Sequence, residues 1–429
     1  MDAKRERYTP NDVGPSPLEW KAPRLSEVST LITNGFVGTA TPFYTDITGV
    51  PYLYGTNVRA NKLETNEIRY VTREFHTAQS KTALKAGDLL TVQSGHIGET
   101  AVVTDQFHGA NCHALIVTRL KQEKADPHYL CFYVNSEIGR ARMKGLEVGS
   151  TILHINTKDL KKFRVLLPSL PEQKKIAQIL STWDKAISVT EKLLTNSQRQ
   201  KKALMQQLLT GKKRLLDENG TRFSETWKLY ALSKLFQRVT TKNNGKSNNV
   251  VTISGQHGLI KQEDFFKKTV ASDTLDGYFL LKKGQFAYNK SYSNGYPMGA
   301  IKRLNRYPEG VVTTLYICFE LTTPKKSCGD YWEHYFESGL LNNSLSQIAH
   351  EGGRAHGLLN VKPSDFFSLK VAVPGFEEQQ KIASVLSAAD TEISTLEKKL
   401  ACLKDEKKAL MQQLLTGKRR VKVDEAVAV

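Results

Sequence analysis

The twelve residues KKALMQQLLTGK occur twice in this chain, at 201–212 and at 407–418, without a single difference. Residues 171–215 and 377–421 align around them with no gap, at a constant offset of 206, and 26 of the 45 positions are identical. Upstream the likeness thins, but Trp20 and Trp227 begin the related segments WKAPRLSEV and WKLYALSKL. The chain is therefore a tandem duplication of two long segments, and not a solenoid of many short repeats.

The repeated segment has the pattern of a long helix with one narrow apolar seam, because its apolar residues recur mostly in steps of three and four. Ser169 to Glu172 form a capping-box pattern at its start, and Gly211 and Gly417 are expected to end the two copies. A helix from about 170 to 210 would be about 60 Å long. We interpret Thr190, Ser197 and Lys201 as interruptions of the first seam. The seam positions, expected to form the spacer and to dock partners, are Ile176, Leu180, Trp183, Ile187, Leu194, Leu204, Leu208, Ile382, Leu386, Ile393, Leu400, Leu410 and Leu414.

Two similar helices with one seam each favour packing on each other, antiparallel and with pseudo-twofold symmetry, as in a twofold dimer. The alternative is that each helix packs only on its own domain. The segments before the helices contain short β-rich runs between Gly, Asn and Ser turns, with one helix expected at 127–145 and another at 330–350. We predict an α+β chain with the following parts: an N-terminal lead at 1–19, recognition domains at 20–168 and 227–374, helical repeats at 169–214 and 375–420, a linker at 215–226 and a tail at 421–429.

The composition points to a partner of opposite charge. Lys and Arg number 61 against 43 Asp and Glu, a formal net charge of +18, and the excess is spread over both halves. Such a distribution suits a long polyanion, although a generally basic protein remains the simpler alternative. The five scattered cysteines and the absence of a signal peptide or an 18-residue apolar run indicate a cytoplasmic protein without a membrane span.

Motifs of an enzyme are missing or incomplete. The sequence KNNGKS at 242–247 has the Gly-Lys-Ser of a phosphate-binding loop, but Thr240 stands where that loop requires glycine. Neither a methyltransferase signature nor a dinucleotide-binding fingerprint is present. The His and Cys residues of GHIGE and HGANCH lack a second ligand pair at zinc spacing, so we read them as loop residues. No catalytic or metal-binding residue is predicted.

The two halves have diverged unevenly, since the helices stayed alike while the α+β domains drifted apart in their loops. Each helix is therefore expected to meet the same kind of partner surface, and each domain to read a different target. Two unlike readers on a twofold-like scaffold would recognise a bipartite, asymmetric site on a duplex, separated by one to two turns at about 34 Å per turn.

The order of domains, the P.L.EQ.KIA..LS..D..I helix start and KKALMQQLLTGK followed by a basic cluster resemble the specificity subunit of type I restriction-modification systems. The resemblance runs from about Trp20 to Arg420. It implies a non-catalytic, DNA-binding subunit in bacterial defence, with two modification subunits docked on the conserved regions and restriction subunits added through them. S-adenosylmethionine, ATP and Mg would then belong to those partners, with no cofactor on this chain.

The residues that contact DNA are expected in two loops of each recognition domain, because Arg, Lys, Asn and Gln are the side chains that reach phosphates and base edges. One loop follows a strand, and the other follows the shorter helix and is flanked by glycine. An ordinary solvated hairpin tip is the competing interpretation for each. The candidates are Gln93, Ser94, His96, Ser150 and Thr151 in the first domain, and Lys290, Tyr292, Asn294, Arg354 and His356 in the second.

Two other functions remain open on the sequence alone. A fused fragment of an enzyme that methylates and cuts would methylate DNA without help. A coiled-coil adaptor that binds only proteins would bind duplex weakly and without regard to sequence.

Overall fold

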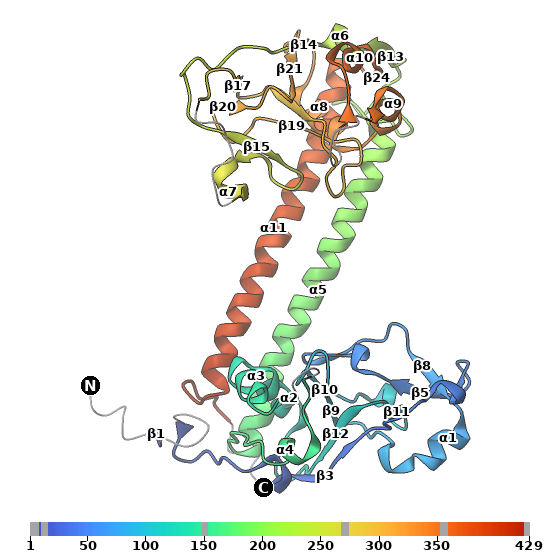
Figure 1. The fold of residues 1–429 in the computed structure, drawn as a ribbon, viewed down its shortest axis with the longest axis vertical. Helices are drawn as coiled ribbons and strands as arrows, with labels where there is room; N and C mark the ends of the chain where they lie inside the picture. Colours follow the sequence, from blue (N-terminus) through green and yellow to red (C-terminus); the bar gives the residue numbers. More distant parts are fainter. Residues whose placement is uncertain (1–7, 10–15, 148–152, 267–273, 352–358, 424–429) are drawn as a thin grey trace. The chain divides into compact units, whose positions relative to one another are not determined.

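The computed structural model describes residues 8–9, 16–147, 153–266, 274–351 and 359–423. The chain forms two compact units, and each long helix contributes to both. Unit 1 comprises Met1–Glu191 with Lys399–Val429, and unit 2 comprises Lys192–Lys398. Figure 1 shows the two long helices, α5 and α11, and the strands and shorter helices of each unit.

The elements before and within the first long helix are β1 (Tyr8–Thr9), β2 (Ser16–Pro17), β3 (Ser29–Asn34), β4 (Tyr44–Thr45), β5 (Val50–Leu53), β6 (Val58–Arg59), β7 (Lys62–Leu63), β8 (Arg69–Val71), α1 (Arg73–Ala78), β9 (Leu89–Val92), β10 (Thr100–Val102), β11 (Asn111–Cys112), β12 (Leu115–Leu120), α2 (Pro127–Asn135), α3 (Glu137–Lys144), α4 (Thr157–Leu160) and α5 (Leu170–Leu208). The later elements are β13 (Lys228–Ala231), α6 (Leu232–Leu235), β14 (Phe236–Arg238), β15 (Val251–Ser254), β16 (Gly258–Lys261), α7 (Gln262–Phe266), β17 (Phe279–Lys282), β18 (Phe286–Asn289), β19 (Ala300–Arg303), β20 (Glu309–Val312), β21 (Ile317–Leu321), α8 (Gly329–Glu337), α9 (Asn342–Ile348), β22 (His350–Glu351), β23 (Leu359–Asn360), α10 (Pro363–Ser368), β24 (Lys370–Val373) and α11 (Phe376–Leu414).

The two units contain the same four-stranded antiparallel sheet. Its strand order is β3-β12-β9-β10 in unit 1 and β14-β21-β18-β19 in unit 2. A turn with a left-handed glycine precedes the first strand of each matching hairpin, β9–β10 and β18–β19: Gly87 at φ 88° and Gly284 at φ 91°. The shared topology confirms the predicted α+β class.

The remaining strands differ between the units. Unit 1 adds a second four-stranded sheet, β11-β5-β8-β4, in which β11 and β5 run parallel. Unit 2 instead has the two hairpin-like pairs β15-β16 and β17-β20. The divergence noted in the sequence therefore lies mainly outside the common sheet.

Each core lies between the common sheet, a short helix and the long helices. In unit 1 it joins Ile116 of β12 and Tyr129 of α2 to Ile176 of α5 and Leu414 of α11, all of them buried. In unit 2 an aromatic cluster of Phe236, Phe286, Phe319 and Trp332 continues into Leu208, Ile382 and Leu386 of the long helices. The seam residues at the helix ends are thus shared between helix pairing and the domain cores.

The prediction of one helix at 127–145 and one at 330–350 was wrong, since both are broken. Ser136 ends α2 and caps α3 with its hydroxyl, which accepts a hydrogen bond from the Gly139 amide at 3.1 Å. In unit 2 the break contains Gly339, at φ 74°, a conformation that favours glycine. A helix-period pattern does not reveal such a break when the polar cap residue also fits the solvent face.

The long helices have nearly the predicted bounds, Leu170–Leu208 and Phe376–Leu414. Gly211 and Gly417 follow at φ 70° and 72°, and each amide donates to the carbonyl three residues earlier. The capping box is not formed as predicted. Both carboxylate oxygens of Glu172 instead accept hydrogen bonds from Arg420, within the described residues.

Polar residues that seemed to interrupt the first seam belong to it. Thr190 and Ser197 are 4% and 9% exposed. The Ser197 hydroxyl donates to the Glu392 carboxylate at 3.1 Å, and Lys201 forms an ion pair with Asp390. The middle seam positions Trp183, Ile187, Leu194, Ile393 and Leu400 are half-buried, as are Leu204 and Leu410. The remaining seam positions are fully buried: Ile176, Leu180, Leu208, Ile382, Leu386 and Leu414. None of the described helices is long and apolar enough to cross a membrane.

Candidate nucleic-acid interface

The first predicted loop connects β9 to β10. Its strands pair in register at Thr91 and Thr100, and the turn contains two left-handed glycines, Gly95 and Gly98. Ser94 and His96 are exposed at the turn, while Gln93 is half-buried. Positive φ at these two glycines lets the chain reverse direction over few residues.

The β9–β10 loop is hydrogen-bonded to the segment that ends the other predicted loop. The Ile155 amide donates to the Gln93 carbonyl at 3.1 Å, and Ser94 forms an antiparallel bridge with His154. Arg140 of α3 donates to the Ile97 carbonyl at 2.7 Å and so fixes the other side of the turn. Ser150 and Thr151 themselves lie outside the described residues.

The second domain repeats this arrangement at the corresponding loop, between β18 and β19. The Leu359 amide donates to the Lys290 carbonyl at 2.9 Å, and the Lys290 ammonium reaches the Val361 carbonyl at 3.4 Å. Val361 stands at the repeat offset of 206 from Ile155, so both domains tie the same segment to the same hairpin. Arg354 and His356 lie outside the described residues.

The exposed side chains of the second hairpin are of the kinds that contact nucleic acid. Tyr292 is 63% exposed and Asn294 is also exposed. Lys290 is half-buried, and its pKa is lowered, first by burial and then by the neighbouring Arg238 guanidinium. Two adjacent cations repel each other, and a phosphate brought between them would relieve that repulsion.

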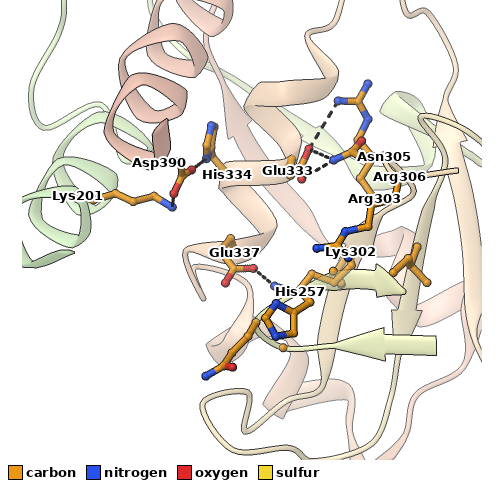
Figure 2. A pocket seen from close by; sticks show the side chains of 15 residues that line it. Lys201, His257, Lys302, Arg303, Asn305, Arg306, Glu333, His334, Glu337 and Asp390 are labelled. Atoms are coloured by element: carbon orange, nitrogen blue, oxygen red, sulfur yellow. Dashed lines mark hydrogen bonds and ion pairs between the residues drawn. The ribbon is translucent and has the colours of Figure 1, made fainter. Parts of the chain in front are cut away.

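A polar network that the sequence did not indicate holds the second hairpin in place. Tyr296 donates its hydroxyl proton to Glu337 of α8 and accepts a hydrogen bond from Lys302 at 2.8 Å. Lys302 also forms an ion pair with Glu337, and Figure 2 shows these two side chains facing each other. Burial and the Glu337 carboxylate raise the pKa of Tyr296. These contacts therefore attach the hairpin to α8.

A pocket of about 330 Å³ lies beside this network, within unit 2 (Figure 2). Its wall is formed by Lys302 and Glu337, by the exposed turn residues Gln256 and His257, and by the group Lys201, Asp390 and His334. The only sequence signal for the turn is the SGQHG stretch at 254–258, which resembles QSGHIG at 93–98 in composition. The pocket is polar and its charges are largely paired. Its ion pairs connect β19 to α8, through Lys302 and Glu337, and α5 to α11, through Lys201 and Asp390.

The repeats bind each other through exchanged ion pairs. In unit 1, Arg420 of the second repeat donates two hydrogen bonds, of 2.7 and 2.9 Å, to the Glu172 carboxylate of the first repeat. In unit 2, Arg214 of the first repeat donates two hydrogen bonds, of 2.6 and 2.7 Å, to the Glu378 carboxylate of the second repeat. The partners in the two pairs are related by the offset of 206. This reciprocity is the pattern of an isologous contact and confirms the predicted pseudo-twofold antiparallel pairing.

A second exchanged pair lies further along the helices. Lys407 pairs with Asp184 in unit 1, as Lys201 pairs with Asp390 in unit 2. A tryptophan closes each outer pair: Arg420 lies over Trp20 and Arg214 over Trp227, both 5.8 Å from the ring centre. The N-terminal lead, which had no assigned role, ends at this contact, because Pro17 and Trp20 lie against Gly417.

The profile of the type I restriction modification DNA specificity domain matches residues 17–196, which include the first recognition domain and part of α5. A Methanocaldococcus jannaschii protein named as the MjaX type I restriction enzyme specificity subunit is 25% identical over 437 residues, covering 98% of each chain. The chain is thus similar to type I restriction-modification specificity subunits, which confirms the resemblance predicted from its sequence. A second relative from the same organism, the MjaVIII specificity subunit, is 24% identical over 332 residues, which cover 71% of this chain and 74% of the relative.

Solved structures of the family have the same fold. The S subunit of a type I restriction-modification system from M. genitalium aligns with a TM-score of 0.56 at 14% identity, covering 92% of this chain and 96% of the other. A chain from work on complex assembly and conformational transition of the type I system gives 0.51 at 15% identity, covering 94% and 99%. The chain thus has the fold that its sequence predicted.

Proposed function

We propose that this specificity subunit reads a bipartite, asymmetric DNA site, one block with each recognition domain. The observation that carries the proposal is that one sheet topology, tied to its second loop at equivalent positions, presents two unlike hairpins. Gln93, Ser94 and His96 would contact the first block, and Lys290, Tyr292 and Asn294 the second. Ser150, Thr151, Arg354 and His356 remain candidates of the adjoining loops.

The paired helices would serve as the spacer between the blocks. Each is a continuous helix of 39 residues, about 58 Å long at 1.5 Å per residue. The exchanged Arg–Glu and Lys–Asp pairs fix the register of one helix on the other, since a shift by one turn would separate every pair. A fixed register would give a fixed gap between the two blocks.

The subunit would have no catalytic activity and would act in the cytoplasm through its partners. Two modification subunits would dock on the repeats, and restriction subunits would join through them. S-adenosylmethionine would bind the modification subunits, and ATP and Mg the partner subunits that require them. Among the described residues of this chain, no three His, Cys, Asp or Glu side chains form a cluster suited to a metal.

The test is selection from a random-duplex library with this subunit and its modification subunit together. We expect two short, unlike blocks with a constant gap, and replacement of residues 227–374 by another reader should change only one block. A single contiguous site would contradict the spacer role. No enrichment at all would favour an adaptor that binds only proteins, and methylation by this chain alone would favour an enzyme fragment.

A further inference from the structure

An arginine without a counter-ion lies among aromatic rings on the second sheet of unit 1, β11-β5-β8-β4, a sheet with no counterpart among the described strands of unit 2. Figure 1 shows β5, β8 and β11 of this sheet beside one another. Arg69 begins β8 and is exposed, and within the described part of the chain no carboxylate lies within ion-pair distance of it. The fold therefore leaves this positive charge available to a partner.

The strand register explains how Arg69 meets the aromatic rings. Arg69 of β8 pairs with Tyr52 of β5, and Val71, two residues further along β8, pairs with Tyr44 of β4. Paired residues, and residues two apart on one strand, share a face of a sheet. The side chains of Arg69, Tyr52 and Tyr44 are therefore brought to one face although they lie far apart in the sequence.

The guanidinium of Arg69 is held by two tyrosines. Its Cζ atom lies over the rings of Tyr44 and Tyr54, 5.3 and 4.9 Å from their centres. Its Nη1 atom donates a hydrogen bond of 2.9 Å to the Tyr44 hydroxyl, and that hydroxyl is hydrogen-bonded to the hydroxyl of Tyr54. Two ring contacts and a hydrogen bond together restrict both the position and the orientation of the guanidinium.

Further rings hold the two tyrosines in place. The Tyr54 ring is stacked on His113, with centres 4.8 Å apart, and His113 Nδ1 lies 3.2 Å from the hydroxyl of the fully buried Tyr52. Burial, and then the Arg69 charge, lower the pKa of His113, so this ring is neutral at pH 7 and adds no second cation. We call Tyr44, Tyr54 and His113 the aromatic platform. The platform is anchored in the small core around Tyr52.

The aromatic platform adjoins the hairpin that is proposed to contact the first DNA block. Leu115, two residues after His113, pairs with Val92, the last residue of β9. Gly55, the residue after Tyr54, also lies beside Val92, since a Cβ atom on it would be 3.6 Å from that side chain. The β9–β10 loop begins directly after Val92, so the platform and this loop belong to one region of the domain.

We propose that Arg69 reads a guanine in the DNA block recognised by the first domain. This inference rests on the proposed function and names one base together with the residue that reads it. Guanine presents two acceptors, O6 and N7, in the major groove, and the fork of an arginine can donate to both. A phosphate contact would need the charge alone, whereas a base contact also needs the fixed orientation that the platform supplies. Tyr44 would be a positioning residue that acts through Arg69.

The experiment uses the full chain together with its modification subunit. Selection from the random-duplex library first gives the two blocks, and the block that survives replacement of residues 227–374 belongs to the first domain. Dissociation constants are then measured for duplexes in which each guanine of that block is replaced by the other bases and by 7-deazaguanine, which lacks the N7 acceptor. Melting curves of every variant report whether it folds.

The variants remove either the guanidinium or its orientation. Arg69→Met removes the charge and the fork, and the milder Tyr44→Phe keeps the ring and the arginine but removes the hydroxyl that Nη1 contacts. The control is Arg24→Met, because Arg24 is also exposed but precedes β3, whereas Phe36, which follows β3, has its ring 6.2 Å from His113 of the platform.

We expect one guanine at which the unchanged chain and Arg24→Met discriminate against the other bases and against 7-deazaguanine by about tenfold or more. Arg69→Met should lose this discrimination at that position alone, and Tyr44→Phe should lose part of it. If Arg69→Met fails to fold, Tyr44→Phe decides, because undiminished discrimination in that variant overturns the proposal.

Three other results would reject the proposal and leave the proposed function standing. Equal weakening of Arg69→Met on all duplexes, with the slope of log K against log salt reduced by about 1, would make Arg69 a phosphate contact. A lower melting temperature with unchanged discrimination would make its role structural. A first block without a guanine would exclude the base that Arg69 is proposed to read. No enrichment by the unchanged chain would overturn both the inference and the proposed function.

Discussion

Removing Arg214, one arginine of the exchanged pairs, should destabilise unit 2 strongly, because the buried Glu378 carboxylate would lose its counter-ion. The side chain of Glu378 is 2% exposed and receives two hydrogen bonds from Arg214 and one from the Trp227 indole at 3.1 Å. Breaking a buried pair by removing one partner costs about 3–5 kcal/mol. Since the indole bond survives in Arg214→Met, we expect the lower end, about 3 kcal/mol.

The assay is differential scanning calorimetry of the full chain, followed at the transition of unit 2. For a unit of this size each kcal/mol lowers the melting temperature by about 2–4 °C, so Arg214→Met should lower it by about 6–12 °C. Adding Glu378→Gln removes the stranded charge and keeps an acceptor for the indole. The double variant should therefore regain most of the loss, to within about 1 kcal/mol of the unchanged chain.

The reasoning would be refuted by either of two results. One is a loss below about 1 kcal/mol in Arg214→Met, which would mean that water reaches Glu378 easily. The other is a double variant as unstable as the single one, which would place the energy in lost packing of the arginine stem over Trp227.

Three further outcomes follow from described contacts. Burial lowers the pKa of His334 below that of a free histidine despite the opposing Asp390, Asp330 and Glu337 carboxylates, and Lys201 adds to the lowering. The unfolded chain then binds the extra proton, so unit 2 should lose stability as pH falls through about 6.5. His334 is the sixth residue of α8, as Phe132 is of α2, and His334→Phe should flatten this dependence in melting curves from pH 7.5 to 5.5. Lys290→Ala should reduce the slope of log K against log salt by about 1 for specific DNA, while Lys325→Ala leaves the slope as it is; equal slopes for both variants would remove Lys290 from the phosphate contacts. Gly299→Ala should disrupt the β18–β19 hairpin and abolish recognition of one block only, because the new Cβ would lie 2.2 Å from the Asn289 carbonyl oxygen. In the control Gly295→Ala the new Cβ meets nothing within 4 Å, so this variant should cost only about 1 kcal/mol of backbone strain. Selection on the duplex library distinguishes the two variants.

The sequence predicted the long helices well because their evidence is local and repeated. Leu170–Leu208 and Phe376–Leu414 have a 3.6-residue apolar period over many turns. Gly211 and Gly417 mark their ends, because both have the left-handed backbone conformation that favours glycine over other residues. The exchanged pairs were invisible for a physical reason. Glu172 fits a capping box equally well by local rules, and only the antiparallel partner brings Arg420 within reach.

The proposed recognition surface could be predicted from the sequence only as a pair of loops in each domain. That Gln93 and Lys290 hold the segments near Ile155 and Val361 follows from strand pairing between residues far apart in sequence, which no local pattern encodes. The network of Tyr296, Lys302 and Glu337 shows the same limit, since its three members come from a loop, a strand and a helix.

One glutamine at the start of each long helix has a consequence for how such chains change over time. Gln173 bonds to the Pro168 and Lys124 carbonyls and to the Asp126 amide, and Gln379 bonds to the Pro374 carbonyl and the Cys328 amide. Apart from the Ser327 hydroxyl, which donates to Gln379 at 3.5 Å, these partners are backbone atoms. The contact therefore depends mainly on the path of the backbone and little on the side chains beyond it. Genetic exchange with crossovers inside the repeats could therefore install an unrelated reader in one event, and the inherited contact would accept it without any compensating mutation.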